Sequence, residues 1–386
     1  MYTGIYRIAD HIFKINTTYS YFYKEAKEYL YNFAIRKDLI EITIDKKDIN
    51  KENKIAKLDK AAYVDNEEYL EYLAVLKKII NALMPLGYYL IFGSAIEMEE
   101  QGYLFITNNG DGTSSHTALY KELFKHRVKY INDKQAIVHV EGNVTYIYGC
   151  PWAGENKLNR NSKTRLKAIV DLTRSKTNNI KKIELSGISG VLSSNIYQDN
   201  KNKDYIATLM NNLDKTVEFY HLDCLENKNA VITSYKGMNH NLNFEDIITF
   251  DGVLVYTAKG TSMLPLIKES KDIITIAKPT RNYKKYDAVL FKRTNGQYVL
   301  HRIVGYNKKH HTYILVGDNQ YHREKGIREY QIFGLLVSIN KGKRQIKNTD
   351  FKYKLYAHLW VDFYFLRCVI LKIKDLFYRA FDKIFS

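Results

Sequence analysis

Hydrophobic and polar residues follow different rhythms in different parts of the chain, and each rhythm predicts its own kind of structure. Apolar residues between positions 67 and 86 recur at helical spacing, which predicts an amphipathic helix. The run YYLIFGSAIE, which begins at Tyr88, is typical of β-strands, and GYLFITNNGDGTSSHTALYKELF follows as strand, polar loop and helix. Strands and helices continue to residue 238, so residues 1–238 are predicted to form an α/β domain.

The pattern changes after this domain. Residues 239–246 are polar with few periodic apolar positions, which predicts a linker. Residues 247–348 consist of short strand-like runs between turns, and this is typical of a mostly-β domain. Residues 349–386 return to helical spacing and predict a C-terminal amphipathic helix. The fold class expected is therefore multidomain, with an α/β domain followed by a mostly-β domain and a helix.

Charge and cysteine content narrow the classes of function. Lys and Arg number 59 against 42 Asp and Glu, a net charge of +17, which suits an anionic partner. Because the basic residues are spread along the chain, nucleic acid is not expected as a partner. Cys150, Cys224 and Cys368 are isolated, so neither a disulfide framework nor a metal site is predicted, and no cofactor is expected. With no secretory signal and no apolar run of spanning length, we expect a cytoplasmic protein, with peripheral attachment to the inner membrane face as an option.

The loop between strand and helix near residue 110 has part of a phosphate-binding pattern. Free N–H groups at a helix N-terminus bind phosphate, and the full pattern is G-x-x-x-x-G-K-[ST]. Gly112 and Ser114 fit that frame and Gly110 lies inside it, but Thr113 stands where the lysine belongs. Without the lysine, the phosphates lose their main point charge. The match on motif terms alone is weak.

The segments around this loop resemble a known family. GYLFITNNGDGTSSHTALY, VKYINDKQAIV, YGCPWAG and LKAIV occur in an order similar to the HPr kinase-like, PEP-carboxykinase-like domain of some bacterial peptide-modification clusters. That family has an α/β fold, a phosphate loop and an aspartate pair. Here Asp133 keeps the first acid and Lys134 replaces the second. The resemblance implies the fold over residues 1–238, and the missing groups favour a pseudokinase that binds a peptide.

A second candidate centre lies in the segment GTSMLPLI, which contains Ser262. A serine is a weak nucleophile at neutral pH and needs a base within hydrogen-bond reach, together with donors for the oxyanion. The segments YVLHRIVGY and YILVGDNQ follow in the chain. The ordered set resembles the signal peptidase I and LexA-like serine peptidase superfamily over residues 247–348, and this resemblance implies a small, mostly antiparallel β domain.

The resemblance assigns roles by position. Ser262 matches the nucleophile and His301 matches the base, in the branch of the superfamily that uses histidine. Asp318 matches the aspartate of the GDN segment, where it either orients the base or supports the turn. Gly260 stands where many members have an oxyanion hydroxyl, so the backbone of Ser262 and its neighbour Thr261 is left to bind the oxyanion.

The C-terminal segment leaves two interpretations open. Residues 352–385 place apolar side chains in a helical stripe that is surrounded by lysine and arginine and rich in aromatic residues. Such a helix is typical of a membrane-interface anchor on an anionic surface. The alternative is a helix that docks on the preceding domain or on a partner protein.

We therefore expect a serine endopeptidase that removes the leader of a ribosomally made precursor peptide, with residues 1–238 recognising that peptide. The association with kinase-like relatives suggests the substrate. Two alternatives remain: a peptide kinase with an accessory peptidase-like domain, and a non-catalytic adaptor. A self-cleaving repressor is not expected, because residues 225–258 lack an Ala-Gly cleavage pair.

Overall fold

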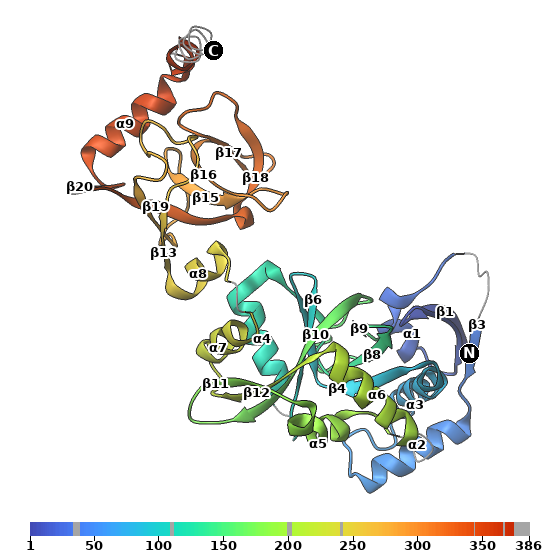
Figure 1. Ribbon diagram of the computed structural model, residues 1–386. Helices are drawn as coiled ribbons and strands as arrows, with labels where there is room; N and C mark the ends of the chain where they lie inside the picture. The colour runs from blue at the N-terminus through green and yellow to red at the C-terminus, as the bar shows by residue number, and fades with distance from the viewer. Residues whose placement is uncertain are drawn as a thin grey trace. The chain divides into compact units, whose positions relative to one another are not determined.

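The computed structural model describes residues 1–33, 39–108, 112–198, 203–239, 242–342, 344–365 and 367–373. The chain forms a multi-sheet structure of helices and strands that divides into two compact units, residues 1–240 and 241–386 (Figure 1). The division lies inside the predicted linker.

The first unit contains two sheets. In the smaller, β1 (Tyr2–Ile8) and β2 (His11–Thr17) form a hairpin and β3 (Leu39–Thr43) pairs parallel with β2. The larger has the order β4-β8-β9-β10-β6-β5-β7, extended by β12 on β10 and β11 on β12. Its long strand β10 pairs parallel with β6 and β12 and antiparallel with β9. The strands of the larger sheet are β4 (Tyr88–Phe92), β5 (Ser94–Met98), β6 (Gln101–Ile106), β7 (Val128–Asn132), β8 (Gln135–Glu141), β9 (Val144–Tyr148), β10 (Lys163–Arg174), β11 (Asn179–Ile183) and β12 (Glu218–Cys224).

Helices of the first unit bury apolar faces against these sheets. The predicted helix is α3 (Glu67–Leu83), continued by a 3-10 turn (Met84–Leu86), and it buries Leu70, Val75, Ile79 and Ile80. The predicted strand, loop and helix near residue 110 are β6 and α4. The remaining helices are α1 (Tyr21–Glu25), α2 (Lys46–Leu58), α4 (Thr113–Phe124), α5 (Leu185–Asn195), α6 (Lys203–Thr216) and α7 (Lys228–Met238), and further 3-10 turns are Lys27–Tyr29 and Lys125–Arg127.

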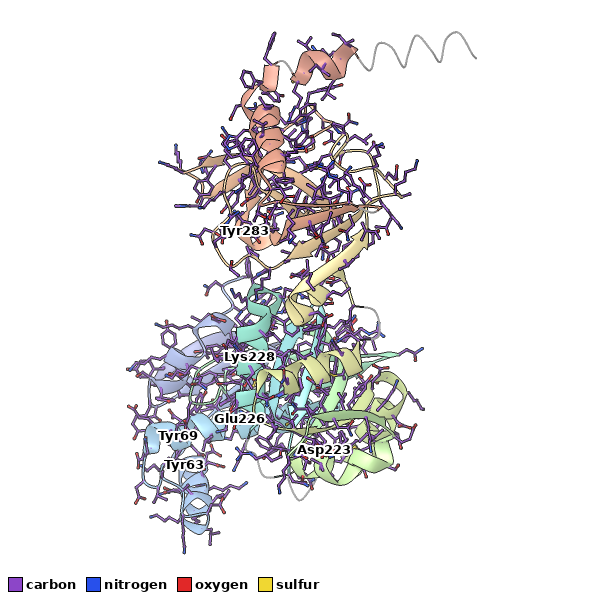
Figure 2. The ribbon with its side chains drawn as sticks, turned by 90° about the vertical axis from the view of Figure 1, so that its left-hand side faces the viewer. Tyr63, Tyr69, Asp223, Glu226, Lys228 and Tyr283 are labelled. Carbon is purple, nitrogen blue, oxygen red and sulfur yellow. The ribbon has the colours of Figure 1, made fainter. Side chains whose placement is uncertain are left out.

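Aromatic side chains pack closely in this unit. Tyr63 and Tyr69, labelled in Figure 2, have ring centroids 5.0 Å apart. The indole of Trp152 is buried, and its Nε1 donates to the carbonyl of Tyr72 at 3.0 Å. Tyr72 in turn donates to the carbonyl of Pro151 at 2.9 Å. These contacts tie the YGCPWAG segment to α3.

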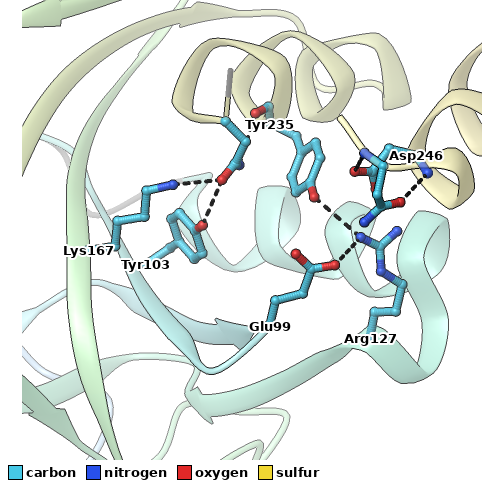
Figure 3. A network of polar contacts seen from close by, with 8 residues as sticks. Glu99, Tyr103, Arg127, Lys167, Tyr235 and Asp246 are labelled. Carbon is cyan, nitrogen blue, oxygen red and sulfur yellow. Dashed lines mark hydrogen bonds and ion pairs between the residues drawn. The ribbon is translucent and has the colours of Figure 1, made fainter. Parts of the chain in front are cut away.

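Polar contacts hold the end of α7 to the sheet. Figure 3 shows Arg127 between Glu99, at 2.5 Å, and the hydroxyl of Tyr235, at 3.3 Å. In the same view, Lys167 donates to Asn239 at 2.7 Å. These contacts link the C-terminal end of α7 to strand β10 and to the 3-10 turn that contains Arg127.

The second unit is built on one antiparallel sheet, as the strand-like runs predicted. Its order is β13-β14-β19-β15-β16-β17-β18, with β20 paired to β19. Apolar side chains from alternating positions, among them Leu254, Ile276 and Leu290, form its core. The strands are β13 (Val253–Thr257), β14 (Ile273–Ala277), β15 (Ala288–Lys292), β16 (Tyr298–Asn307), β17 (Thr312–Val316), β18 (Glu324–Arg328), β19 (Ile332–Lys341) and β20 (Arg344–Lys347), with a 3-10 turn at Glu329–Gln331.

Two helices flank this sheet in the sequence. Helix α8 (Phe244–Asp251) begins inside the predicted linker 239–246, so that part of the linker prediction is wrong. Asn243 and Asp246 form a capping box that satisfies the first N–H groups of the helix. Helix α9 (Phe351–Asp362) begins the predicted C-terminal helix. Among the described residues, no helix combines the length and the hydropathy needed to cross a bilayer.

Candidate active site

Ser262 lies in a tight turn between β13 and β14. Gly260 takes a left-handed conformation, with φ of 85°, just before the serine. The N–H of Ile267 donates to the carbonyl of Met263 at 2.9 Å, and both of those side chains are buried in the core. The turn is therefore anchored from below by apolar packing, while Ser262 remains partly exposed.

His301 lies in the middle of β16, opposite Val289 of β15. Its side chain is 1% exposed. An imidazole held this deeply has one orientation fixed by its neighbours, so its two nitrogens face different surroundings. Within the part of the chain that the structure describes, neither ring nitrogen makes a hydrogen bond, and a general base needs one nitrogen that is able to accept a proton.

Glu324 lies beside one of these nitrogens. Its Oε1 is 2.9 Å from Nδ1 of His301, an ion-pair distance that lacks the alignment of a hydrogen bond. Arg293 donates to both oxygens of the same carboxylate, from Nη2 to Oε1 at 2.6 Å and from Nε to Oε2 at 2.8 Å. Partial burial opposes ionisation of Glu324, but Arg293 and His301 outweigh it and lower the pKa of Glu324 to about 2. The carboxylate is therefore charged at neutral pH.

Gly317 brings the serine turn and the histidine together. A Cβ placed on Gly317 would lie 2.7 Å from the carbonyl oxygen of Ser262 and 3.0 Å from Nε2 of His301. The next residues hold this approach, because the N–H of Asn319 donates to the carbonyl of Ser262 at 2.7 Å. Ser262 and His301 line one cavity of about 530 Å³, together with Thr261, Gln320 and several apolar side chains. Nε2 of His301 thus faces the serine turn, and Nδ1 faces Glu324.

Asp318 has a different partner from the one expected of a base-orienting residue. It forms two hydrogen bonds with Arg302, Oδ1 to Nε at 2.9 Å and Oδ2 to Nη2 at 2.7 Å. Both side chains are fully buried. Burial opposes the charge of Arg302, but Asp318 more than compensates and the pKa of Arg302 is raised. Of the two roles that the sequence left open for Asp318, these contacts fit the support of the turn, and the carboxylate beside the base belongs to Glu324.

Helix α9 covers this turn from outside. The hydroxyl of Tyr356 donates to Oδ2 of Asp318 at 3.1 Å, and the indole of Trp360 donates to the Asp318 carbonyl at 2.6 Å. Farther along the chain, Arg367 donates to the carbonyl of Gln320 at 3.1 Å. The docked interpretation of the C-terminal segment therefore holds for this face of the helix. Residue 366 and residues 374–385 of the predicted stripe lie outside the described residues.

Donors for an oxyanion are available at the serine turn. Within the part of the chain that the structure describes, the N–H groups of Thr261 and Ser262 pair with no acceptor. The carbonyl of Thr261 is engaged by the N–H of Leu264 at 3.2 Å, which holds the turn in shape. The serine turn therefore has unpaired N–H groups and a hydroxyl beside a cavity that His301 also lines, and acyl transfer needs groups of these kinds.

The phosphate-loop residues of the first unit lie around a separate cavity. Thr113 and Ser114 open helix α4 and line a cavity of about 410 Å³ with Asp133 and Lys134. Gly112, at φ of 94°, caps the helix and lines a neighbouring cavity. Gly110 lies outside the described residues. The structure thus brings together Thr113, Ser114 and Asp133, with Gly112 next to them.

Asp133 is occupied by a structural contact. Its Oδ1 accepts the N–H of Gly154 at 2.6 Å, and the side chain is buried. The neighbouring Asn132 donates to the carbonyls of Cys150 and Trp152, each at 3.1 Å. The INDK segment therefore holds the YGCPWAG segment in place. Among the described residues, no cluster of histidine, cysteine and acidic side chains has the arrangement of a metal site.

Comparisons with known proteins give a weak result. No family model matches the chain, and no curated protein matches it. One matching solved structure is the HPr(Ser) kinase/phosphatase from Coxiella burnetii, with 12% sequence identity and a TM-score of 0.19, over 32% of this chain and 94% of that chain. A likeness of this size supports no conclusion about activity.

The sequence did not identify Glu324 or Arg293 as members of the site. Glu324 had one available signal, because it is the single acidic residue between Asp318 and Glu329. Arg293 had no such signal in the sequence. It lies in the turn after β15, where its N–H donates to the carbonyl of Gln297 and its carbonyl accepts from the N–H of Gly296. Only the fold of the sheet places its guanidinium against the carboxylate of β18.

Proposed function

We propose that the chain is a serine endopeptidase in which Ser262 is the nucleophile and His301 is the general base. The single observation that carries this proposal is the meeting of the serine turn and His301 in one cavity, with the charged carboxylate of Glu324 on the far side of the imidazole. The resemblance of the ordered serine, HRIV and GDN segments to signal peptidase I and LexA-like peptidases supports the same assignment, and with it a peptidase fold for the second unit.

The proposed reaction has an acylation step and a deacylation step that use the same groups. Nε2 of His301 accepts the proton of the Ser262 hydroxyl as the oxygen attacks the peptide carbonyl. The N–H groups of Ser262 and Thr261 stabilise the oxyanion. His301 then donates the proton to the leaving amine, and a water molecule repeats the sequence to release the acyl group and restore the serine.

Glu324 has the role of stabilising the imidazolium that forms during both steps. Its carboxylate must face Nδ1 for that purpose, and Arg293 holds it there from the opposite side. Arg293 is therefore a positioning residue that acts through Glu324. Asp318 is assigned to the support of the turn that carries Gly317.

The cavity indicates the kind of residue next to the scissile bond. Beside Ser262 and His301 it is lined by apolar side chains that include Leu254, Ile276 and Leu290, and also by two basic ones, Lys259 and Arg293. A small or medium apolar side chain of a peptide fits such a lining better than a charged one.

We propose as substrate a precursor peptide whose leader is removed, with the first unit, an HPr kinase-like pseudokinase, recognising it. Thr113 in the lysine position and Asp133 engaged by Gly154 both disfavour phosphoryl transfer there.

The test is cleavage of a complex peptide library, read by mass spectrometry, with the wild type, Ser262→Ala and His301→Ala. We expect site-selective cleavage by the wild type and a loss of about 10³-fold or more in each variant. Ser270→Ala and His322→Ala are matched controls, because both residues are exposed and lie outside the cavity. No cleavage by the folded wild type, or full cleavage by Ser262→Ala, would contradict the proposal.

A further inference from the structure

The C-terminal helix α9 has one buried face and one exposed face, and both contain apolar side chains. Tyr353, Ala357 and Val361 are buried against the second unit. On the other face, Phe351, Leu355, Leu359 and Phe363 recur at a spacing of four residues and are 77%, 47%, 49% and 58% exposed. Residues at this spacing lie on one side of a helix, so Phe351, Leu355 and Leu359 form one stripe, and Phe363 follows directly after the helix ends at Asp362. We call these four residues the outer stripe.

The polar contacts that hold the helix to its unit come from residues outside the outer stripe. The contacts of α9 with the sheet and the GDN turn come from the inner face, where Tyr353 meets Arg302 at 3.2 Å and Tyr356 and Trp360 meet Asp318. Proteins that stay free in water rarely leave a contiguous apolar patch on the surface without a partner for it. The outer stripe is therefore an interaction surface, and its partner must accept apolar side chains.

Charge identifies that partner. Residues 241–386 contain 26 lysine and arginine residues and 13 aspartate and glutamate residues, so the second unit carries +13 of the chain's +17. The net charge of the whole chain does not show that most of the positive charge belongs to the second unit. Lys352 and Lys354 lie within the outer stripe's own segment, and Lys372 follows on the continuing helix; all three are exposed. The second unit is thus strongly basic as a whole, and two of its exposed lysines lie on the helix that carries the stripe.

We propose that the outer stripe, together with Lys352 and Lys354, docks the second unit on an anionic lipid bilayer. Apolar side chains that enter the interface and lysines that meet anionic headgroups are the two contributions that bind interfacial helices to membranes. A second copy of this chain suits the stripe less well, because two units of +13 repel each other. Nucleic acid would attract the lysines but has no use for exposed leucine and phenylalanine.

This inference does not depend on the catalytic assignment. It also explains why a helix that is docked on its unit has apolar residues on its exposed side as well: the inner face holds the GDN turn, and the outer face remains available to the bilayer. Deletion of the helix is an unsuitable test, since it would uncover the buried pair of Arg302 and Asp318. Point substitutions on the exposed face leave that pair intact.

The experiment measures cosedimentation of the full-length chain with vesicles of phosphatidylglycerol and phosphatidylcholine, and with phosphatidylcholine alone. We expect binding to the mixed vesicles that weakens as salt is raised, and little binding to the neutral ones. Leu355→Gln/Leu359→Gln/Phe363→Gln and Lys352→Gln/Lys354→Gln should each lower the binding constant about tenfold or more. Circular dichroism and thermal unfolding report whether the variants are folded.

Matched controls use exposed residues of the same unit outside the helix. Val255→Gln removes an exposed apolar side chain of β13, and Lys308→Gln/Lys309→Gln removes two charges from the loop after β16. Both should bind as the wild type does. Equal binding by the stripe variant and the wild type, no binding of the wild type to mixed vesicles at low salt, or a dimer that the stripe variant abolishes would each overturn the proposal.

Discussion

Oε1 of Glu324 lies 2.9 Å from Nδ1 of His301, although the two residues belong to strands β18 and β16, which are not neighbours in the sheet. The long segment between β17 and β18 contains the GDN turn and returns the chain to the histidine. The segment that contacts Ser262 through its turn therefore also leads into the strand whose carboxylate contacts His301.

The ionisation of Glu324 predicts how stability depends on pH. Its pKa is lowered from 4.5 to about 2 in the folded chain, so the unfolded state binds the proton more readily. The stabilisation by this carboxylate is present above about pH 4.5 and is lost as pH falls toward 2. The difference in thermal stability between the wild type and Glu324→Gln should therefore shrink over that range. If the difference stays constant over that range, the ionised form of Glu324 contributes no stability through Arg293 and His301.

Arg293 lines the same cavity as Ser262 and His301, and we predict that it acts through Glu324. Glu324→Gln should lower kcat by roughly 10²–10⁴-fold, as the loss of a base-orienting carboxylate does in known serine peptidases. Arg293→Gln should lower kcat by less, and in the Glu324→Gln background it should have almost no further effect, because the two residues share one contact. The measurement is a double-mutant cycle on kcat for a peptide from the library. Additive losses would assign Arg293 a direct role toward the substrate. Glu329→Gln, an exposed acid of the same region, is the control.

Gly317→Ala should reduce activity by at least tenfold while the fold is retained. The added methyl group would lie 2.7 Å from the Ser262 carbonyl and 3.0 Å from Nε2 of His301, so one of the two must move, and small displacements of reacting groups have large kinetic effects. Gly305→Ala is the matched control, because its methyl group would meet only Ile314, at 3.6 Å. Equal activity in the two variants would show that the serine turn and the histidine need not approach as they do here.

Asp318→Asn separates support from catalysis. The variant leaves Arg302 buried without its charged partner, and loss of one member of such a pair costs about 3–5 kcal/mol. Hydrogen exchange of the peptide that spans residues 317–321 should become much faster. Tyr356→Phe removes one hydrogen bond to the same carboxylate and should cost about 1 kcal/mol. A stable Asp318→Asn variant without activity would instead return Asp318 to the catalytic group.

The sequence by itself determined the features that depend on local order. The helical spacing from residue 67 gave α3, and alternation after residue 247 gave the antiparallel sheet of the second unit, because each regular element imposes its own period on the residues that it buries. The capping box at Asn243 was equally local and was readable in the sequence, although it was assigned to a linker. Ser262 and His301 were identifiable because each lies within a short segment of characteristic residues.

The tertiary structure alone decided which carboxylate faces which partner. His301 and Arg302 are adjacent in β16, so their side chains point to opposite faces of the sheet. Asp318 meets Arg302 on one face, and Glu324 meets His301 on the other. The spacing between residues carries no information about which loop returns to which face. The same holds for α9, whose aromatic and apolar residues are continuous in the sequence. Contacts with Arg302 and Asp318 place Tyr353, Tyr356 and Trp360 on the inner side of the helix. The sequence could not predict this division, because it depends on the surface that the helix packs against.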